Sequence, residues 1–155
     1  MRCPRVILSA TAVAAMSALL WHSQAGADAL DHYQPAPLVK AERALERGDA
    51  TRALGLLDGR VDTLRAGVER AQGHALVCRA RFARGEFDLA ERACDAAVEE
   101  GGGAAAWSHL NNRGVMRLLL GRSEEALADF HAAERLNPAA GSVRRNIAAA
   151  RRHPA

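Results

Sequence analysis

Residues 107–140 decide the fold, and they read WSHLNNRGVMRLLLGRSEEALADFHAAERLNPAA. Apolar residues recur at helical spacing on both sides of Gly121, which predicts two helices joined by a tight turn. Gly114 stands seven residues before this glycine, and Ala126 stands five residues after it. Small side chains at both places allow two antiparallel helices to approach closely, so the stretch predicts a helical hairpin.

The same pattern occurs twice more, around Gly48 and Gly85, at spacings of 37 (48 to 85) and 36 (85 to 121) residues. Around each of the three turn glycines the chain places a small residue seven before, an alanine five after and a core residue nine after: Ala41, Ala53 and Leu57; Cys78, Ala90 and Cys94; Gly114, Ala126 and Phe130. A single hairpin cannot bury its apolar face, so consecutive hairpins are expected to stack. The sequence therefore predicts an all-α array of about three antiparallel helix hairpins.

The helical pattern predicts seven helices, at 36–47, 50–58, 68–84, 87–100, 105–120, 123–136 and 141–152. Gly55 and Gly59 interrupt the second of these, which is expected to be short or bent. Residues 101–103 are three glycines and predict a loop between repeats. The helix at 141–152 has no partner and is expected to cap the end of the array.

The 107–140 segment resembles a tetratricopeptide repeat over its full 34-residue length. The matching positions are Leu110, Gly114, Gly121, Ala126, Phe130, Ala133, Asn137 and Pro138. Segments 71–104 and 34–67 match at fewer positions, and together the three repeats and the capping helix give a domain at 38–152.

This resemblance implies a right-handed superhelix whose concave groove is lined by the first helix of each hairpin and binds a peptide segment of a partner protein. Mapped residue by residue, the implied groove holds Leu38, Glu42, Leu45, Arg79, Phe82, Asn111, Val115 and Arg145. Phe82 and Arg79 are expected to be the main contacts, because aromatic and arginine side chains carry a large share of binding energy.

The N-terminus has the three parts of a secretory signal peptide. Arg2 and Arg5 precede an apolar stretch at 6–21, and Ala25-Gly26-Ala27 forms a small-residue cleavage site. We expect residues 1–27 to be removed, which predicts a periplasmic or secreted protein. The alternative is an uncleaved anchor, since the apolar stretch is only slightly shorter than a membrane span. Residues 28–37 are expected to form an extended leader, which overlaps the first predicted helix at 36 and 37.

The charge balance argues against nucleic acid as a partner. The whole chain carries a formal charge of +3, and loss of Arg2 and Arg5 with the signal would leave +1 (3 minus 2). Phosphate binding needs a concentrated basic face, which this composition does not supply. Membrane contact is expected only if the N-terminal segment is retained.

The chain has no motif for catalysis, for a cofactor or for nucleotide phosphates. The carboxylates of Glu99-Glu100, Glu124-Glu125 and Asp129 are expected on solvent-facing helix surfaces. The sequence therefore predicts a protein that is not an enzyme, with no cofactor and no metal ion.

Cys78 and Cys94 stand seven residues before and nine residues after Gly85, so an antiparallel hairpin brings them to the same height. Export favours a disulfide between them, and the alternative is two reduced cysteines that fill core space. His74 lies one helical turn before Cys78 and could join both as a soft metal ligand. Two functions follow: a protein-binding scaffold or assembly factor of the cell envelope, and alternatively a small metal- or redox-active protein using these three residues.

Overall fold

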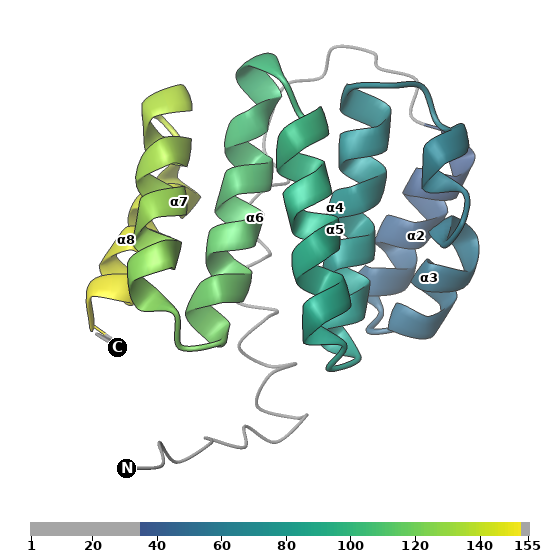
Figure 1. The fold of residues 1–155 in the computed structure, drawn as a ribbon, viewed down its shortest axis with the longest axis horizontal. Coiled ribbons are helices and arrows are strands. Elements are labelled where there is room, and N and C mark those ends of the chain that lie inside the picture. The colour runs from purple at the N-terminus through teal and green to yellow at the C-terminus, as the bar shows by residue number, and fades with distance from the viewer. Residues whose placement is uncertain (1–34, 153–155) are drawn as a thin grey trace.

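The computed structural model describes residues 35–152, and within this range the backbone is helical with no β-strand (Figure 1). The elements are α2 (Ala36–Glu46), α3 (Ala50–Leu57), η1 (Val61–Thr63), α4 (Val68–Ala83), α5 (Phe87–Glu100), η2 (Gly103–Ala105), α6 (Ala106–Leu119), α7 (Ser123–Leu136) and α8 (Gly141–Arg152). The predicted all-α class is confirmed for this part of the chain, and each α-helix begins and ends within one residue of its predicted bounds. The predicted signal peptide, 1–27, lies outside the described residues.

The three hairpin turns close in the same way. Gly48, Gly85 and Gly121 all adopt positive φ, at 76°, 76° and 79°. The glycine N–H and the next N–H both return to carbonyls of the last helical turn, as in Asp49 N to Ala44 O at 2.8 Å. This arrangement satisfies the otherwise unpaired carbonyls at a helix end, and it requires a residue that tolerates the left-handed region. The spacing of these glycines therefore sets the spacing of the hairpins.

The predicted leader is too long at its C-terminal end. Helix α2 starts at Ala36 and contains Pro37 in its first turn, preceded by Pro35 with an extended ψ of 133°. A proline is accommodated in the first turn of a helix, because the N–H that it lacks has no intrahelical partner there. The remaining leader residues, 28–34, lie outside the described range.

Helix α3 is short, as its glycines predict. It has 8 residues, whereas its counterparts α5 and α7 have 14 each. The Asp49 side chain caps its start by accepting a hydrogen bond from Arg52 N at 2.9 Å. After Asp58 the chain turns through Gly59 at a φ of 70° and enters η1.

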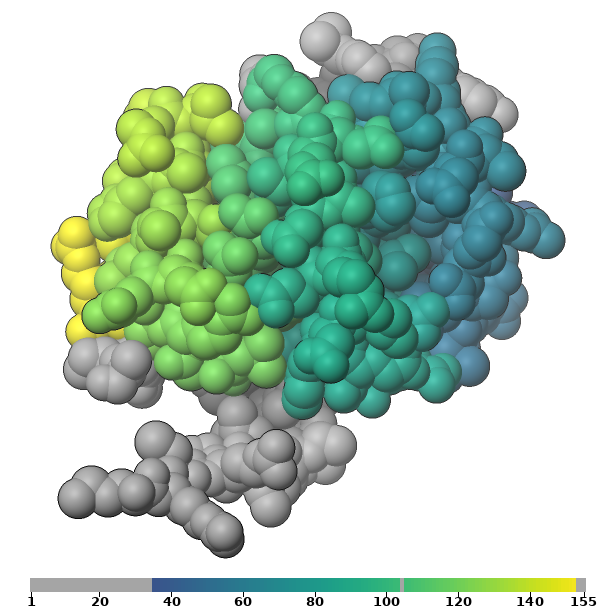
Figure 2. Space-filling model, viewed as in Figure 1, coloured from purple at the N-terminus to yellow at the C-terminus, as the bar shows by residue number. Residues whose placement is uncertain are grey.

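The helices form two layers. The first layer contains α2, α4, α6 and α8, and the second layer contains α3, α5 and α7. Each second-layer helix packs mainly on the helix before it and then on the helix after it in the chain. Figure 1 places α2 and α8 at opposite ends of the molecule. Figure 2 shows the same order on the surface, where successive segments occupy successive bands. Each hairpin therefore contacts mainly its sequence neighbours.

The interior contains three clusters of buried apolar residues. An N-terminal cluster combines α2, α3 and part of α4, a C-terminal cluster combines α6, α7 and α8, and a middle cluster contains Cys78, Phe82, Ala90, Cys94 and Met116. The middle cluster joins α4, α5 and α6, so it lies between the other two in chain order. Each hairpin thus buries its own apolar face against the next.

A different pair of residues lies between the two helices of each hairpin. In the first, Ala41 and Leu57 share one core cluster. In the third, Gly114 lies so close to Phe130 that an added Cβ would be 2.6 Å from the ring carbon Cε1. In the second, a covalent bond fills the space: Cys78 and Cys94 form a disulfide with Cα atoms 5.2 Å apart. The predicted pairing of the two cysteines is confirmed.

Replacing Gly114 by alanine should destabilise the protein. The new Cβ forces the Phe130 ring to move, and overpacking of this kind costs about 1–3 kcal/mol, which exceeds the gain of about 0.5–1 kcal/mol from helix propensity. Gly55→Ala is the matched control, since open space surrounds that position in α3. It should raise the free energy of unfolding in urea. Adding Phe130→Leu to Gly114→Ala should cost less than the sum of the two single changes; strict additivity would contradict the packing described here.

The disulfide should contribute to stability by restricting the unfolded chain. Fifteen residues lie between Cys78 and Cys94, whose sequence separation is 16, and closure of such a loop is worth about 3 kcal/mol. Urea unfolding with and without reductant measures this difference, and a Cys78→Ala/Cys94→Ala variant should be insensitive to reductant. Alkylation followed by mass measurement should add two more tags after reduction than before; Cys3, where retained, adds one to both samples. Two reactive thiols in the unreduced folded protein would refute the bond.

Candidate functional site

The structure corrects the implied groove at half of its positions. Four of the eight side chains are buried and cannot be touched by a partner: Leu38 at 1% exposure, Phe82 at 2%, Asn111 at 1% and Val115 at 1%. Leu38 belongs to the N-terminal cluster and Val115 to the C-terminal cluster. Their helices do belong to the first layer, but these side chains point between helices rather than out of the layer.

Phe82 is a core residue rather than a binding contact. Its ring lies in the middle cluster, and its centroid is 5.3 Å from that of Phe87 at an interplanar angle of 54°. Aromatic rings pair favourably in such tilted arrangements. Phe82 therefore joins α4 to the start of α5, next to the disulfide, and a change there acts on stability.

Asn111 has a structural partner. Its side-chain oxygen accepts a hydrogen bond from Asn146 Nδ2 at 2.9 Å, and both side chains are buried. A buried amide needs such a partner, because leaving it unpaired costs about 1–3 kcal/mol. This pair links α6 to α8 and fixes how the last helix sits on the array.

The other four predicted groove residues reach the surface. Glu42, Leu45 and Arg79 are half-buried, and Arg145 is exposed. Burial lowers the pKa of Arg79, while the nearby carboxylates of Glu42 and Glu46 act in the opposite direction. Arg79 of α4 therefore faces acidic side chains of α2, so the structure brings Glu42 and Arg79 together. Arg145 lies far from them, at the α8 end of the molecule.

Asp129 is the centre of an ionic network that the sequence reasoning missed. It was expected on a solvent face, but it is only 4% exposed. Arg113 donates to both of its carboxylate oxygens, at 3.0 and 2.7 Å, and Arg117 Nη1 donates at 2.7 Å. Arg113 also donates to Asp95 of α5 at 2.8 Å. Hydrogen bonds to Asp129, its largest interaction, raise the pKa of Arg113.

This network holds α6 between α5 and α7. Arg113 and Arg117 are four residues apart and therefore share one face of α6, which is the signal that could have located it. Breaking a buried ion pair from one side leaves an uncompensated charge, so the network fixes the helices firmly. Each charged group in it is paired with an opposite charge, and its only buried polar atom without a hydrogen-bond partner among the described residues is Arg117 Nε, so the network acts as a structural element.

The three residues of the alternative metal or redox site do not form a ligand set in this structure. Both sulfur atoms are in the disulfide, and metal binding by cysteine needs the free thiolate. His74 is half-buried on α4, one turn before Cys78. Across residues 35–152, no group of three or more His, Cys, Asp and Glu side chains is arranged to hold a metal ion.

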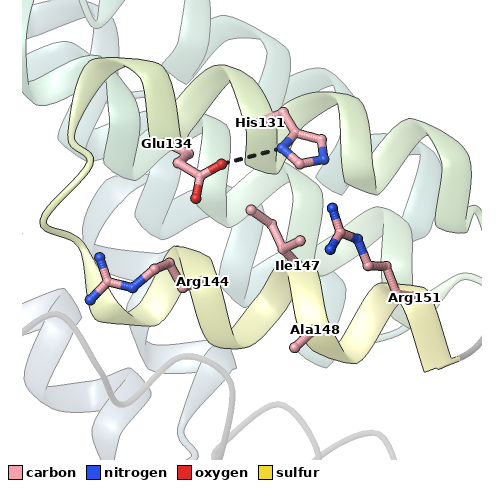
Figure 3. A pocket seen from close by; sticks show the side chains of 6 residues that line it. All are labelled: His131, Glu134, Arg144, Ile147, Ala148 and Arg151. Carbon is pink, nitrogen blue, oxygen red and sulfur yellow. Dashed lines mark hydrogen bonds and ion pairs between the residues drawn. The ribbon is translucent and has the colours of Figure 1, made fainter.

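A shallow groove lies between α7 and α8, and we call it the α7/α8 groove. Its volume is about 220 Å³, and it is lined by His131, Glu134, Arg144, Ile147, Ala148 and Arg151 (Figure 3). His131 Nδ1 and Glu134 Oε2 are 3.3 Å apart on the α7 side. Small-molecule sites usually measure about 300–1,000 Å³ and are mostly apolar. The dimensions and charged rim of this groove suit a protein segment better than a small molecule.

His109 is a buried histidine near the glycine loop. It is 3% exposed, and its Nδ1 has no hydrogen-bond partner among the described residues. It packs against Gly101, where an added Cβ would clash with the imidazole ring and lie 2.7 Å from the Ala97 carbonyl oxygen. Burial lowers the pKa of His109 to about 4, because the charged imidazolium is poorly solvated there.

The buried His109 should make stability depend on pH. The unfolded chain binds a proton near the ordinary pKa of 6.5, whereas the folded protein binds it only near 4. The contribution of this residue is therefore complete above pH 6.5 and is lost as the pH falls towards 4, by about 2–3 kcal/mol between pH 7.5 and 4.5. Urea unfolding at pH 7.5 and 4.5 measures this loss. His109→Leu should shrink the difference between the two pH values by that amount; an unchanged difference would contradict it.

Comparison of the chain with protein-family models, with curated proteins and with solved structures finds no match. In the part of the chain that the structure describes, every helix is too short or too polar to cross a membrane.

Proposed function

We propose that this chain is an exported, non-enzymatic scaffold or assembly factor of the tetratricopeptide-repeat type, which binds a segment of a partner protein. The observation that carries this proposal is the stacking of hairpins in two layers, with each hairpin packed mainly on its neighbours. Such quasi-one-dimensional stacks present extended surfaces that are suited to binding proteins.

The contacts between helices support a curved array. Each first-layer helix contacts the next one, from α2 to α4, α4 to α6 and α6 to α8, whereas the described second-layer helices contact one another less. Helices that approach closely on one side and spread on the other give a stack a concave and a convex face. This difference supports our proposal that the first layer forms the concave face of a superhelix.

The exposed part of the first layer offers a mixed surface. Glu42, Leu45 and Arg79 lie on α2 and α4 and combine an acidic, an apolar and a basic side chain. Protein interfaces commonly combine an apolar contact with arginine and a polar rim. We therefore place the partner segment over α2 and α4, with Arg79 as the main contact.

Engagement of the buried Asp129, Asn111 and cysteine side chains supports a non-catalytic role. Asp129 binds two arginines, Asn111 binds Asn146, and both cysteines form the disulfide. Catalytic side chains must be available to a substrate, and these groups are occupied by one another. The disulfide also supports export, since such bonds persist in oxidising compartments.

Reversing the charge of Arg79 should weaken partner capture. Arg79→Glu is expected to cost about 2 kcal/mol of binding free energy, the usual threshold of a main interface contact. Arg92→Glu, the same change on the exposed surface of α5, is the matched control.

A photo-crosslinking side chain at position 45 should give a defined protein adduct from the exporting cell, and one at position 92 should not. Thermal unfolding must confirm that the variants stay folded. Adducts from position 92 alone would place the partner on the second layer and overturn this proposal.

A further inference from the structure

Helix α8 differs from the other first-layer helices. Helices α2, α4 and α6 are each followed by a second-layer helix that packs on them, namely α3, α5 and α7. In the described part of the chain, α8 has only the preceding α7 on that side. The α7/α8 groove is the surface that another second-layer helix would cover.

Ala148 continues the close-approach register of the hairpins. It follows Gly114 by 34 residues (148 minus 114), as Gly114 follows Cys78 by 36 and Cys78 follows Ala41 by 37. Those three residues are buried beneath a second-layer helix, whereas Ala148 is exposed and lines the groove (Figure 3). A small residue therefore stands where a helix could approach α8 closely.

Arg151 continues a second register, that of Arg81 and Arg117, at spacings of 36 and 34 residues. Each earlier arginine lies between carboxylates from both sides of its helix. Arg81 binds Asp58, which follows α3, at 2.6 Å and also Glu86, which precedes α5. Arg117 binds Asp129 of α7 at 2.7 Å and lies 3.9 Å from Glu91 of α5. Arg151 is exposed and has no ion pair within residues 35–152.

We propose that the α7/α8 groove docks an acidic amphipathic helix of a partner protein, which takes the place of a fourth second-layer helix. The helix lies antiparallel to α8 and places a carboxylate against Arg151. Its central apolar side chain has the size of leucine. Phenylalanine fits over Gly114 only because that residue lacks a Cβ, whereas in the first hairpin the alanine shares its core cluster with Leu57.

Charge selects the occupant. The groove contains one carboxylate, Glu134, whose Oε2 lies 3.3 Å from His131 Nδ1. The described residues after it contain five arginines and no carboxylate: Arg135, Arg144, Arg145, Arg151 and Arg152. A second copy docked by two-fold symmetry would bring this basic surface against itself. A copy docked end to end would bring it against α2, whose exposed charges are Lys40, Arg43 and a single acid, Glu46. Both arrangements set like charges together, so an acidic partner is favoured.

This inference concerns a different surface from that of Arg79 and stands or falls separately. If Arg79→Glu leaves partner capture unchanged but a peptide still docks in the α7/α8 groove, the proposed function fails and this inference holds. If partner capture depends on Arg79 but no peptide docks in the groove, the inference fails and the proposed function holds.

The test uses a surrogate helix of known sequence. A labelled peptide with residues 123–136 carries four carboxylates and one arginine, and in the folded chain it presents Phe130 to Gly114 and Asp129 to Arg117. It is made once with phenylalanine and once with leucine at position 130, and each is titrated against the full chain by fluorescence anisotropy. The leucine peptide should bind about tenfold more tightly, because the phenylalanine overpacks against the Ala148 Cβ.

Variants of the groove sharpen the test. Ala148→Gly should reverse the order of the two peptides, as at Gly114. Arg151→Glu should weaken both by about tenfold, since it replaces an attractive charge by a repulsive one. Arg92→Glu should change neither. Thermal unfolding of each variant confirms that α8 stays packed.

Four outcomes would overturn the inference. If both peptides bind equally, or if a scrambled peptide of the same composition binds as well, the binding would be explained by non-specific attraction between charges. No binding at about 1 mM peptide, near the weak limit of specific recognition, would exclude a helix site. A photo-crosslink from position 148 to a second copy or to residues 1–34 would identify a different occupant. Binding to phosphatidylglycerol vesicles without binding to either peptide would mark a membrane-facing surface.

Discussion

The structure depends on one contact that recurs in every complete hairpin. The residue seven positions before the turn glycine and the residue nine positions after it belong to the same part of the core, and together they limit the distance between the two helices. The three solutions are alanine with leucine, a disulfide, and glycine with phenylalanine. Protein interiors tolerate little change in volume, which restricts the pairs of side chains that these two positions can hold. The stacking of the hairpins follows, because helices held at one spacing present similar surfaces to their neighbours.

Charged groups then fix each hairpin against the next. Arg81 and Arg117 stand four residues before their turn glycines and reach carboxylates of two hairpins at once. An arginine suits this position because its planar group has several donors that point in different directions. Apolar contacts are non-directional, whereas hydrogen-bonded ion pairs require a defined geometry of donor and acceptor. These ion pairs therefore add geometric specificity to the packing of the core.

The sequence predicted the helices and the disulfide well because both depend on local spacing. Turn glycines mark the helix ends, and the positions of Cys78 and Cys94 around Gly85 follow from hairpin geometry alone. The direction in which each side chain points was harder to predict from the sequence. Phe82, Asn111 and Val115 stand on first-layer helices, but whether a side chain points out of a layer or between helices depends on a rotation that spacing does not fix. Asp129 was missed for a related reason: a carboxylate is expected on the surface unless its arginine partners are known. Those partners, Arg113 and Arg117, come from another helix.

The position of the disulfide has a consequence for how the protein unfolds. The covalent bond lies in the middle cluster, which is the one that connects the N-terminal and C-terminal clusters. In a linear array, stability passes from unit to unit through nearest-neighbour contacts. The disulfide stabilises the central hairpin, on which both ends of the array pack. Local opening should therefore begin at the two ends, α2 and α8. Reduction of the bond removes this constraint from the central hairpin only, so its effect on local opening should be largest in α4 and α5 and should decrease towards α2 and α8.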